Sequence, residues 1–158
     1  MTEATKSSGR SKKRPVEILL IEDDEGDARL LSRAFKKGGI DLPVRTIPDG
    51  EAALAYLEKG TSREDLSLAP PALVLLDLKL PKVNGLQVLE HIKSSAILRR
   101  LPVIVLTSSD QPEDVNRAYD LGANSYLVKP VSFGDFCELA THIKTYWLRL
   151  NTTPTINF

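Results

Sequence analysis

The sequence has little cysteine and no long apolar run, and these two features argue against a disulfide-stabilised protein and a membrane-spanning protein. Its single cysteine, Cys137, excludes an internal disulfide framework and suits a reducing cytoplasm. No apolar stretch approaches the roughly 18 residues that a membrane-spanning helix needs, so we expect a cytoplasmic protein without a membrane segment. The 158 residues, 42% of them hydrophobic, are enough for one domain with its own core.

Net charge is also absent, because 21 basic side chains are balanced by 21 acidic ones. Five of the basic residues lie within 1–15 beside one acid, which leaves 16 basic and 20 acidic residues in the remainder. An acidic domain argues against a nucleic-acid surface, which usually shows as a basic stripe. Residues 1–15 have no apolar run behind their charged start, so we interpret them as a disordered basic tail and not a secretory signal.

Two common nucleotide motifs are missing. The chain contains neither a Gly-x-x-x-x-Gly-Lys-Ser/Thr loop nor a Gly-x-Gly-x-x-Gly turn, so it has no evident nucleotide cradle. The two histidines, His91 and His142, lie in helical patterns without the spacing of metal ligands, and we assign no metal to them.

What the sequence does contain is an alternation of short apolar runs with amphipathic patterns. The runs are rich in Val, Ile and Leu, as in strands buried on both faces, and they predict a doubly wound α/β fold with a parallel five-stranded (βα)5 sheet. We expect this domain to span residues 16–150, followed by a flexible C-terminus at 151–158. The expected strands begin at Val16, Val44, Ala72, Pro102 and Ser125, and the helices near Asp27, Asp49, Leu86, Pro112 and Phe133.

Polar side chains follow several of these strands. The central run ends at Asp77, after which Pro81 prevents regular pairing and Asn84-Gly85 supplies turn chemistry. Right-handed crossovers place the carboxyl ends of all parallel strands at one edge of the sheet, where ligands bind. The residues expected at that edge are Glu22, Asp23, Asp24, Asp77, Thr107, Ser108 and Lys129.

Such a set of side chains has a specific chemistry. Several neighbouring carboxylates repel one another unless a hard cation neutralises them, and oxygen ligands with room for water suit Mg²⁺. A carboxylate such as Asp77 can attack phosphorus to form an acyl phosphate. The cation, Lys129 and the Thr107 hydroxyl would then neutralise charge on the phosphoryl oxygens.

Each of these signals also has an ordinary structural interpretation. The acids at 22–24 could be a solvated helix N-terminus, and Asp77 could cap a strand end. Thr107 and Tyr126 could be core packing, and Lys129 a solvent-facing charge. The functional interpretation rests on all of them occurring in order at the ends of separate strands.

The runs ILLIEDD, LVLLDLKLPKVNGLQVL, PVIVLTSSD and GANSYLVKP resemble, in order and spacing, the receiver domain of bacterial two-component response regulators. The resemblance extends from about Glu17 to Leu150 and implies a flavodoxin-like sheet with strand order 2-1-3-4-5. It implies that Asp77 accepts a phosphoryl group from the phosphohistidine of a sensor histidine kinase. Glu22 and Asp23 match the acid pair that binds Mg²⁺, together with Asp77 and the backbone carbonyl of Lys79.

The same resemblance assigns the switch residues. Thr107 matches the hydroxyl that moves to the phosphoryl group, and Tyr126 the aromatic that turns inward behind it. Lys129 matches the lysine of the site, and its bond to Pro130 is cis in this family. Lys79 and Ser109 flank the path of attacking water. Output is expected from the face formed by the fourth helix, fifth strand and fifth helix.

A narrower resemblance concerns single-domain regulators of bacterial phytochrome kinases. It rests on the opening Glu-Asp-Asp-Glu-Gly-Asp, the long loop before the central strand and a Tyr-Trp-Leu-containing last helix. It implies a phytochrome kinase as partner and a homodimer through the last helix and fifth strand. The apolar stripe expected there is Phe136, Leu139, Ile143, Tyr146, Trp147 and Leu150.

The expected function is therefore a single-domain response regulator, a switch that catalyses only its own phosphorylation and dephosphorylation and is not otherwise an enzyme. The alternative is a phosphorelay intermediate that passes the group to a histidine phosphotransfer protein. Aspartyl-phosphate phosphatases usually carry Asp-x-Asp, whereas this chain has Asp77-Leu78-Lys79. A flavodoxin-type carrier is disfavoured because acids occupy the turn that would bind the cofactor phosphate. A receiver-like domain that needs no phosphorylation is excluded only by the complete acid, hydroxyl and lysine set.

Overall fold

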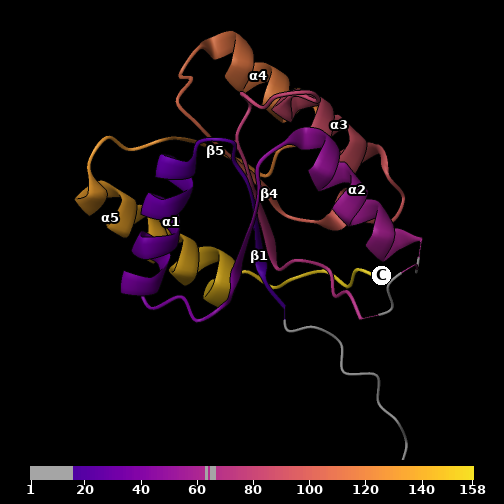
Figure 1. Ribbon diagram of the computed structural model, residues 1–158, viewed down its shortest axis with the longest axis horizontal. Helices are drawn as coiled ribbons and strands as arrows, with labels where there is room; N and C mark the ends of the chain where they lie inside the picture. The colour runs from indigo at the N-terminus through magenta and orange to yellow at the C-terminus, as the bar shows by residue number, and fades with distance from the viewer. Residues whose placement is uncertain (1–15, 63, 65–66) are drawn as a thin grey trace, which may run out of the picture.

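The computed structural model describes residues 16–62, 64 and 67–158, and the predicted basic tail at 1–15 lies outside them. Five parallel strands form one sheet in the order β2-β1-β3-β4-β5. The sheet lies between two groups of helices (Figure 1). The predicted fold and strand order are therefore confirmed. The strands are β1 (Ile18–Ile21), β2 (Val44–Ile47), β3 (Leu73–Leu76), β4 (Val103–Thr107) and β5 (Ser125–Val128).

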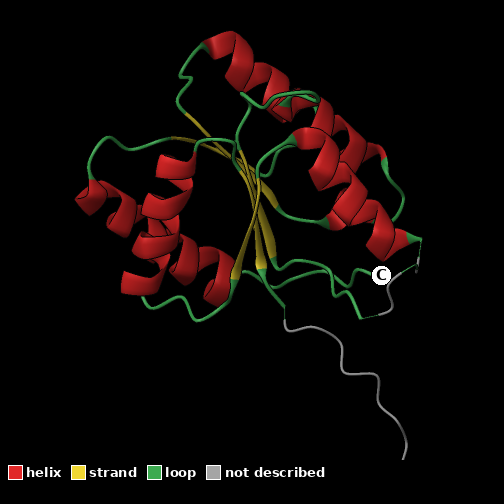
Figure 2. Cartoon of the chain, viewed as in Figure 1, coloured by secondary structure: helices red, strands yellow, loops and turns green. Residues whose placement is uncertain are grey.

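Helices cover both faces of the sheet (Figure 2). One layer consists of α1 (Glu25–Lys37) and α5 (Phe133–Ile143), and the other of α2 (Gly50–Thr61), α3 (Gly85–Ser94) and α4 (Pro112–Asp120). A short 3₁₀ turn, η1 (Leu98–Arg100), precedes β4. None of the helices in the described ranges is both long and apolar enough to cross a membrane.

The two layers bury alternate residues of the same strands. Ile18 and Leu20 of β1 pack toward α1 and α5, whereas Leu19 and Ile21 pack toward α2, α3 and α4. β3 and β4 are buried on both faces in the same way. Each fully buried aliphatic side chain contributes about 1.5 to 3 kcal/mol, which explains why these strands are continuous apolar runs.

Side-chain caps start the helices where the sequence indicates. The Asp49 carboxylate accepts from the Ala52 N–H at 2.7 Å, as predicted for the start of α2. Asn84 and Gln87 form a reciprocal capping box at the start of α3. Pro112 is the first residue of α4.

The last helix is expected to be one regular α-helix to about Leu150, and the structure differs. α5 ends at Ile143, and the chain continues as a π-helical segment, η2 (Lys144–Leu150). Hydrogen bonds of the i→i+5 type widen each turn, so residues at regular α-helical spacing no longer share one face. Tyr146 is consequently 52% exposed and Leu150 72% exposed, although Phe136 is buried.

The C-terminal segment, residues 151–158, which the sequence predicts to be flexible, forms no helix or strand but packs two of its side chains against the core. It crosses from η2 past residues that precede the strands, toward α2 (yellow in Figure 1). Ile156 and Phe158 pack against the core beneath α2 and α3. Gly60 of α2 leaves room for the Phe158 ring, since a Cβ there would lie 2.3 Å from it. Burial of these two apolar side chains thus offsets part of the entropy lost when the segment is ordered.

Candidate phosphoryl and metal site

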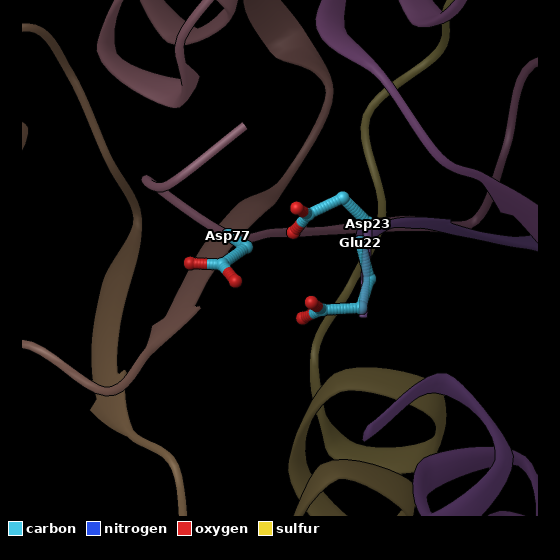
Figure 3. A group of neighbouring side chains, drawn as sticks. All are labelled: Glu22, Asp23 and Asp77. Carbon is cyan, nitrogen blue, oxygen red and sulfur yellow. The ribbon is translucent and has the colours of Figure 1, made fainter. Parts of the chain in front are cut away.

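Three carboxylates gather at the carboxyl edge of the sheet. Glu22 and Asp23 follow β1, and Asp77 follows β3, where its N–H donates to the Ile21 carbonyl at 3.0 Å. One oxygen of each carboxylate lies within 4.8 Å of the others (Figure 3). Glu22 and Asp77 are buried, whereas Asp23 is exposed to solvent. The predicted acid set is therefore assembled in space.

Lys129, which follows β5, bonds to three acids. Its ammonium lies 2.7 Å from Glu22 Oε2, 2.8 Å from Asp77 Oδ2 and 2.8 Å from Asp27 Oδ2. Burial alone would lower the pKa of Lys129, but the hydrogen bonds that it donates to Asp27, Asp77 and Glu22 outweigh burial and raise that pKa above its ordinary value. The ammonium is therefore a fixed positive charge beside the Asp77 carboxylate.

The cluster contains more negative charge than one ammonium neutralises. Burial, with a smaller contribution from the charge of Asp77, raises the pKa of Glu22 from 4.5 to about 7, although the hydrogen bond that Lys129 donates lowers it. A divalent cation beside these oxygens would stabilise the ionised form of Glu22. The donor set, carboxylate oxygen only, suits a hard cation.

Two acids of the first helical turn differ from expectation. Asp24, grouped with the strand-end acids, is an exposed N-cap whose carboxylate accepts from the Asp27 N–H at 2.8 Å. Asp27, predicted only to lie at the start of a helix, also accepts a hydrogen bond from the Lys129 ammonium. A signal existed, since a helix that starts at Glu25 places Asp27 in its first turn, above the end of β1.

The Thr107 hydroxyl is fully buried at the end of β4. Within the part of the chain that the structure describes, it has no hydrogen-bond partner. A buried hydroxyl without a partner costs about 1 to 3 kcal/mol, so an acceptor brought to this site would relieve that cost. The Thr107 carbonyl accepts from the Lys129 N–H at 2.8 Å, which joins the ends of β4 and β5.

Tyr126 and Ser109 tie the loop between β4 and α4 to both of its neighbours. The Tyr126 phenol donates to the Ser109 carbonyl at 2.8 Å, and its ring packs against the core under α3 and α4. The Ser109 hydroxyl donates to Asp114 of α4 at 2.5 Å. The loop that follows Thr107 is therefore held from β5 and from α4 together.

The loop between β3 and α3 folds back onto Asp77. Gly85 donates its N–H to the Leu78 carbonyl at 3.0 Å, and a Cβ at Gly85 would lie 2.2 Å from the Asp77 carbonyl oxygen. Only glycine permits this approach. The Lys79 N–H donates to Asp77 Oδ1 at 3.1 Å, which orients the carboxylate, while the Lys79 side chain is exposed.

The expected cis bond before Pro130 is wrong. Within the described ranges every peptide bond is trans, including that between Lys129 and Pro130. The trans form of an X–Pro bond is lower in energy by about 0.5 to 1 kcal/mol. With this bond trans, the Lys129 ammonium contacts all three acids.

Comparisons with known proteins agree with this geometry. The family model for the response regulator receiver domain matches residues 18–141. The probable methanogenesis regulatory protein FilR2 of Methanothrix harundinacea is 46% identical over 140 residues, which cover 89% of this chain and 88% of the relative. Response regulator Rcp1 of Synechocystis sp. is 39% identical over 140 residues, covering 89% and 94%.

Solved structures give the same result. The phosphorylated cyanobacterial phytochrome response regulator RcpA is 36% identical with a TM-score of 0.80, covering 89% of this chain and 99% of that one. The Mn²⁺-bound form of Rcp1 is 39% identical with a TM-score of 0.78, covering 89% and 100%. The likeness to phytochrome response regulators is thus confirmed. The chain belongs to the response regulator receiver family of two-component signalling.

Proposed function

We propose that this chain is a phosphorylation-dependent switch in which Asp77 accepts a phosphoryl group from the phosphohistidine of a sensor kinase. One observation carries the proposal: the buried Asp77 carboxylate lies 2.8 Å from the Lys129 ammonium and shares a cation-sized cluster with Glu22 and Asp23. Such a group is positioned to act as a nucleophile on phosphorus and has charge beside it to stabilise the product.

The transfer needs only positioning and charge neutralisation. An Asp77 oxygen attacks phosphorus, the bond from phosphorus to the donor nitrogen breaks, and its electron pair leaves with the imidazole. Negative charge spreads over the three equatorial oxygens. Lys129 lies beside the attacking carboxylate and would donate to one of these oxygens. The Lys79 N–H holds the other Asp77 oxygen in place.

The acids fit Mg²⁺, the cation that we propose for the site. Glu22, Asp23, Asp77 and the backbone carbonyl of Lys79 would hold it, directly or through water. When bound, it would neutralise part of the charge that accumulates on the phosphoryl oxygens. Support comes from the carboxylate spacing, the raised pKa of Glu22 and the description of the Rcp1 structure as Mn²⁺-bound.

The switch would start at Thr107. A phosphoryl oxygen on Asp77 offers the acceptor that the buried hydroxyl lacks, so phosphorylation favours movement of Thr107 toward it. The loop after Thr107 is bonded to Tyr126 and, through Ser109, to α4. Movement there would be transmitted to the face formed by α4, β5 and α5, which we propose as the output surface.

The proposed donor is a histidine kinase of the phytochrome class, because RcpA, at 36% identity, is described as a phytochrome response regulator. We further propose that the chemistry of this chain is confined to its own phosphorylation and dephosphorylation. The residues after Asp77 support this, since Leu78 and Lys79 provide no second acid to protonate a leaving group.

We propose a homodimer through η2, α5 and β5. Exposed apolar side chains on these elements support it, among them Tyr146, Leu150 and Val128. Trp147 is a poor probe because it packs against the core of its own chain. Leu150→Ser should shift the mass measured by light scattering toward the 17.4 kDa monomer, whereas Ile97→Ser, at an exposed apolar site elsewhere, should not. A monomeric wild-type protein would refute the dimer.

The proposed phosphorylation is tested by intact mass. After incubation with phosphoramidate and Mg²⁺, the wild type should gain ~80 Da as an acyl phosphate, and Asp77→Asn should gain nothing. Asp120→Asn, which removes an exposed acid at the end of α4, should label like the wild type. An unlabelled wild type or a labelled Asp77→Asn would contradict the assignment.

A further inference from the structure

Asp27 is an acid of the site that the established set of family residues leaves out. It lies in the first turn of α1, and its carboxylate is 2.8 Å from the Lys129 ammonium. Its side chain is 33% exposed, whereas those of Glu22 and Asp77, the other two acids on Lys129, are 1% and 6% exposed. Water can therefore reach Asp27 more easily than either buried partner.

The capping of α1 does not require the Asp27 carboxylate. Asp24 caps the helix through the Asp27 backbone N–H, so the Asp27 side chain is free to point at Lys129. The other acid of this turn, Glu25, is exposed and pairs with Arg29 at 3.7 Å. The two acids share a helical turn but differ in their contact with Lys129.

Lys129 has three N–H donors, and three carboxylates occupy them. When Asp77 becomes an acyl phosphate, its own carboxylate charge is replaced by the larger charge of the phosphoryl group. Glu22 and Asp27 still share the single positive charge of Lys129. Asp27 and Asp77 contact the same ammonium, so Asp27 would also place a negative charge near a phosphoryl group on Asp77.

We propose that Asp27 is a positioning residue that draws Lys129 toward α1 and shares its charge, and thereby lowers the affinity of the site for the phosphoryl group. The inference rests on the proposed function, because it assumes that Asp77 and Lys129 bind that group. Asp27 would set how completely a given donor phosphorylates the protein, and the carboxylate would favour the cation while it opposes the anion.

This difference in sign makes the role testable. Asp27→Asn keeps an oxygen that can accept from Lys129 and removes the charge. We would measure Mg²⁺ binding by calorimetry, and then binding of beryllofluoride, a phosphoryl mimic, by ¹⁹F NMR at saturating Mg²⁺ and low salt. Relative to wild type, Asp27→Asn should bind Mg²⁺ about two- to fivefold more weakly and beryllofluoride about two- to fivefold more tightly, as expected for one partly exposed charge.

Glu25→Gln is the matched control, since it removes an equal charge from the same turn without touching Lys129. It should change both affinities less than twofold. Weaker binding of both ligands by Asp27→Asn would show that Asp27 only holds the site together, and unchanged binding would show no role. Either result, or equal effects in Glu25→Gln, overturns the inference. A wild type that binds neither ligand would instead refute the proposed function.

Discussion

Replacement of Thr107 by valine should stabilise the unphosphorylated protein and disable the switch. Thr107 is fully buried, and its hydroxyl has no partner among the described residues. Valine has nearly the same shape and the same β-branch, so it removes the hydroxyl without opening a cavity. The change therefore isolates the cost of that one polar atom.

The expected gain follows from that cost. Leaving a buried hydroxyl unpaired is unfavourable by about 1 to 3 kcal/mol, and Thr107→Val recovers this amount in the free energy of unfolding. For a domain of this size each kcal/mol raises the melting temperature by about 2 to 4 °C. Thr107→Ser keeps the hydroxyl but loses a buried methyl group, which should cost about 1 kcal/mol.

The assay is urea unfolding with and without beryllofluoride and Mg²⁺. Thr107→Val should be more stable than wild type alone, but gain less from the phosphoryl mimic because it cannot donate to it. Thr107→Ser should be less stable than wild type alone, but it should gain more from the phosphoryl mimic than Thr107→Val does, because it keeps the hydroxyl. If Thr107→Val is less stable than wild type, the hydroxyl has a partner in solution, and the proposal that phosphorylation supplies its missing acceptor fails.

Two further predictions concern the same edge of the sheet. The pKa of Glu22 is about 7 in the folded protein and 4.5 ordinarily, so between these pH values the folded state holds a proton that the unfolded chain has lost. The free energy of unfolding should therefore fall by up to about 3 kcal/mol from pH 4.5 to 7. Urea unfolding without divalent cations should show this fall for the wild type and a smaller one for Glu22→Gln. A wild-type profile that rises over that range would show that Glu22 ionises normally. Gly85→Ala should reduce the rate of Asp77 labelling at least about tenfold, since its Cβ would collide with the Asp77 carbonyl, whereas Gly134→Ala, in an open position on α5, should label normally in the same mass assay. Normal labelling of Gly85→Ala would mean that the loop relaxes without moving Asp77.

The sequence predicted most of the fold because local and global signals agree. The bounds of β2 and β5 match the prediction, the Asp49 carboxylate caps α2, and Pro112 lies in the first turn of α4 as expected. Short apolar runs between amphipathic patterns leave few alternatives to a parallel sheet. That topology alone places Glu22 and Asp77 at one edge, directly after two adjacent strands.

What the sequence did not predict depends on geometry between elements. The contact of Asp27 with Lys129 joins residues 102 positions apart and depends on how α1 is turned against β5. The change to π-helical turns at Lys144 follows no local pattern that we recognise. The packing of Phe158 requires glycine at position 60, and sequence periodicity does not predict a contact between residues so far apart in the chain.

The course of residues 151–158 bears on how a signal can spread. This segment links the α5 layer to the α2 layer at the end of the molecule remote from Asp77, and Arg100 donates to its Thr155 carbonyl at 3.4 Å. Both helical layers are thereby anchored at a common base. Under the proposed phosphorylation of Asp77, strain would not easily separate the two layers at this end, so displacement should concentrate in the loops at the carboxyl ends of the strands, where we propose that a partner protein binds.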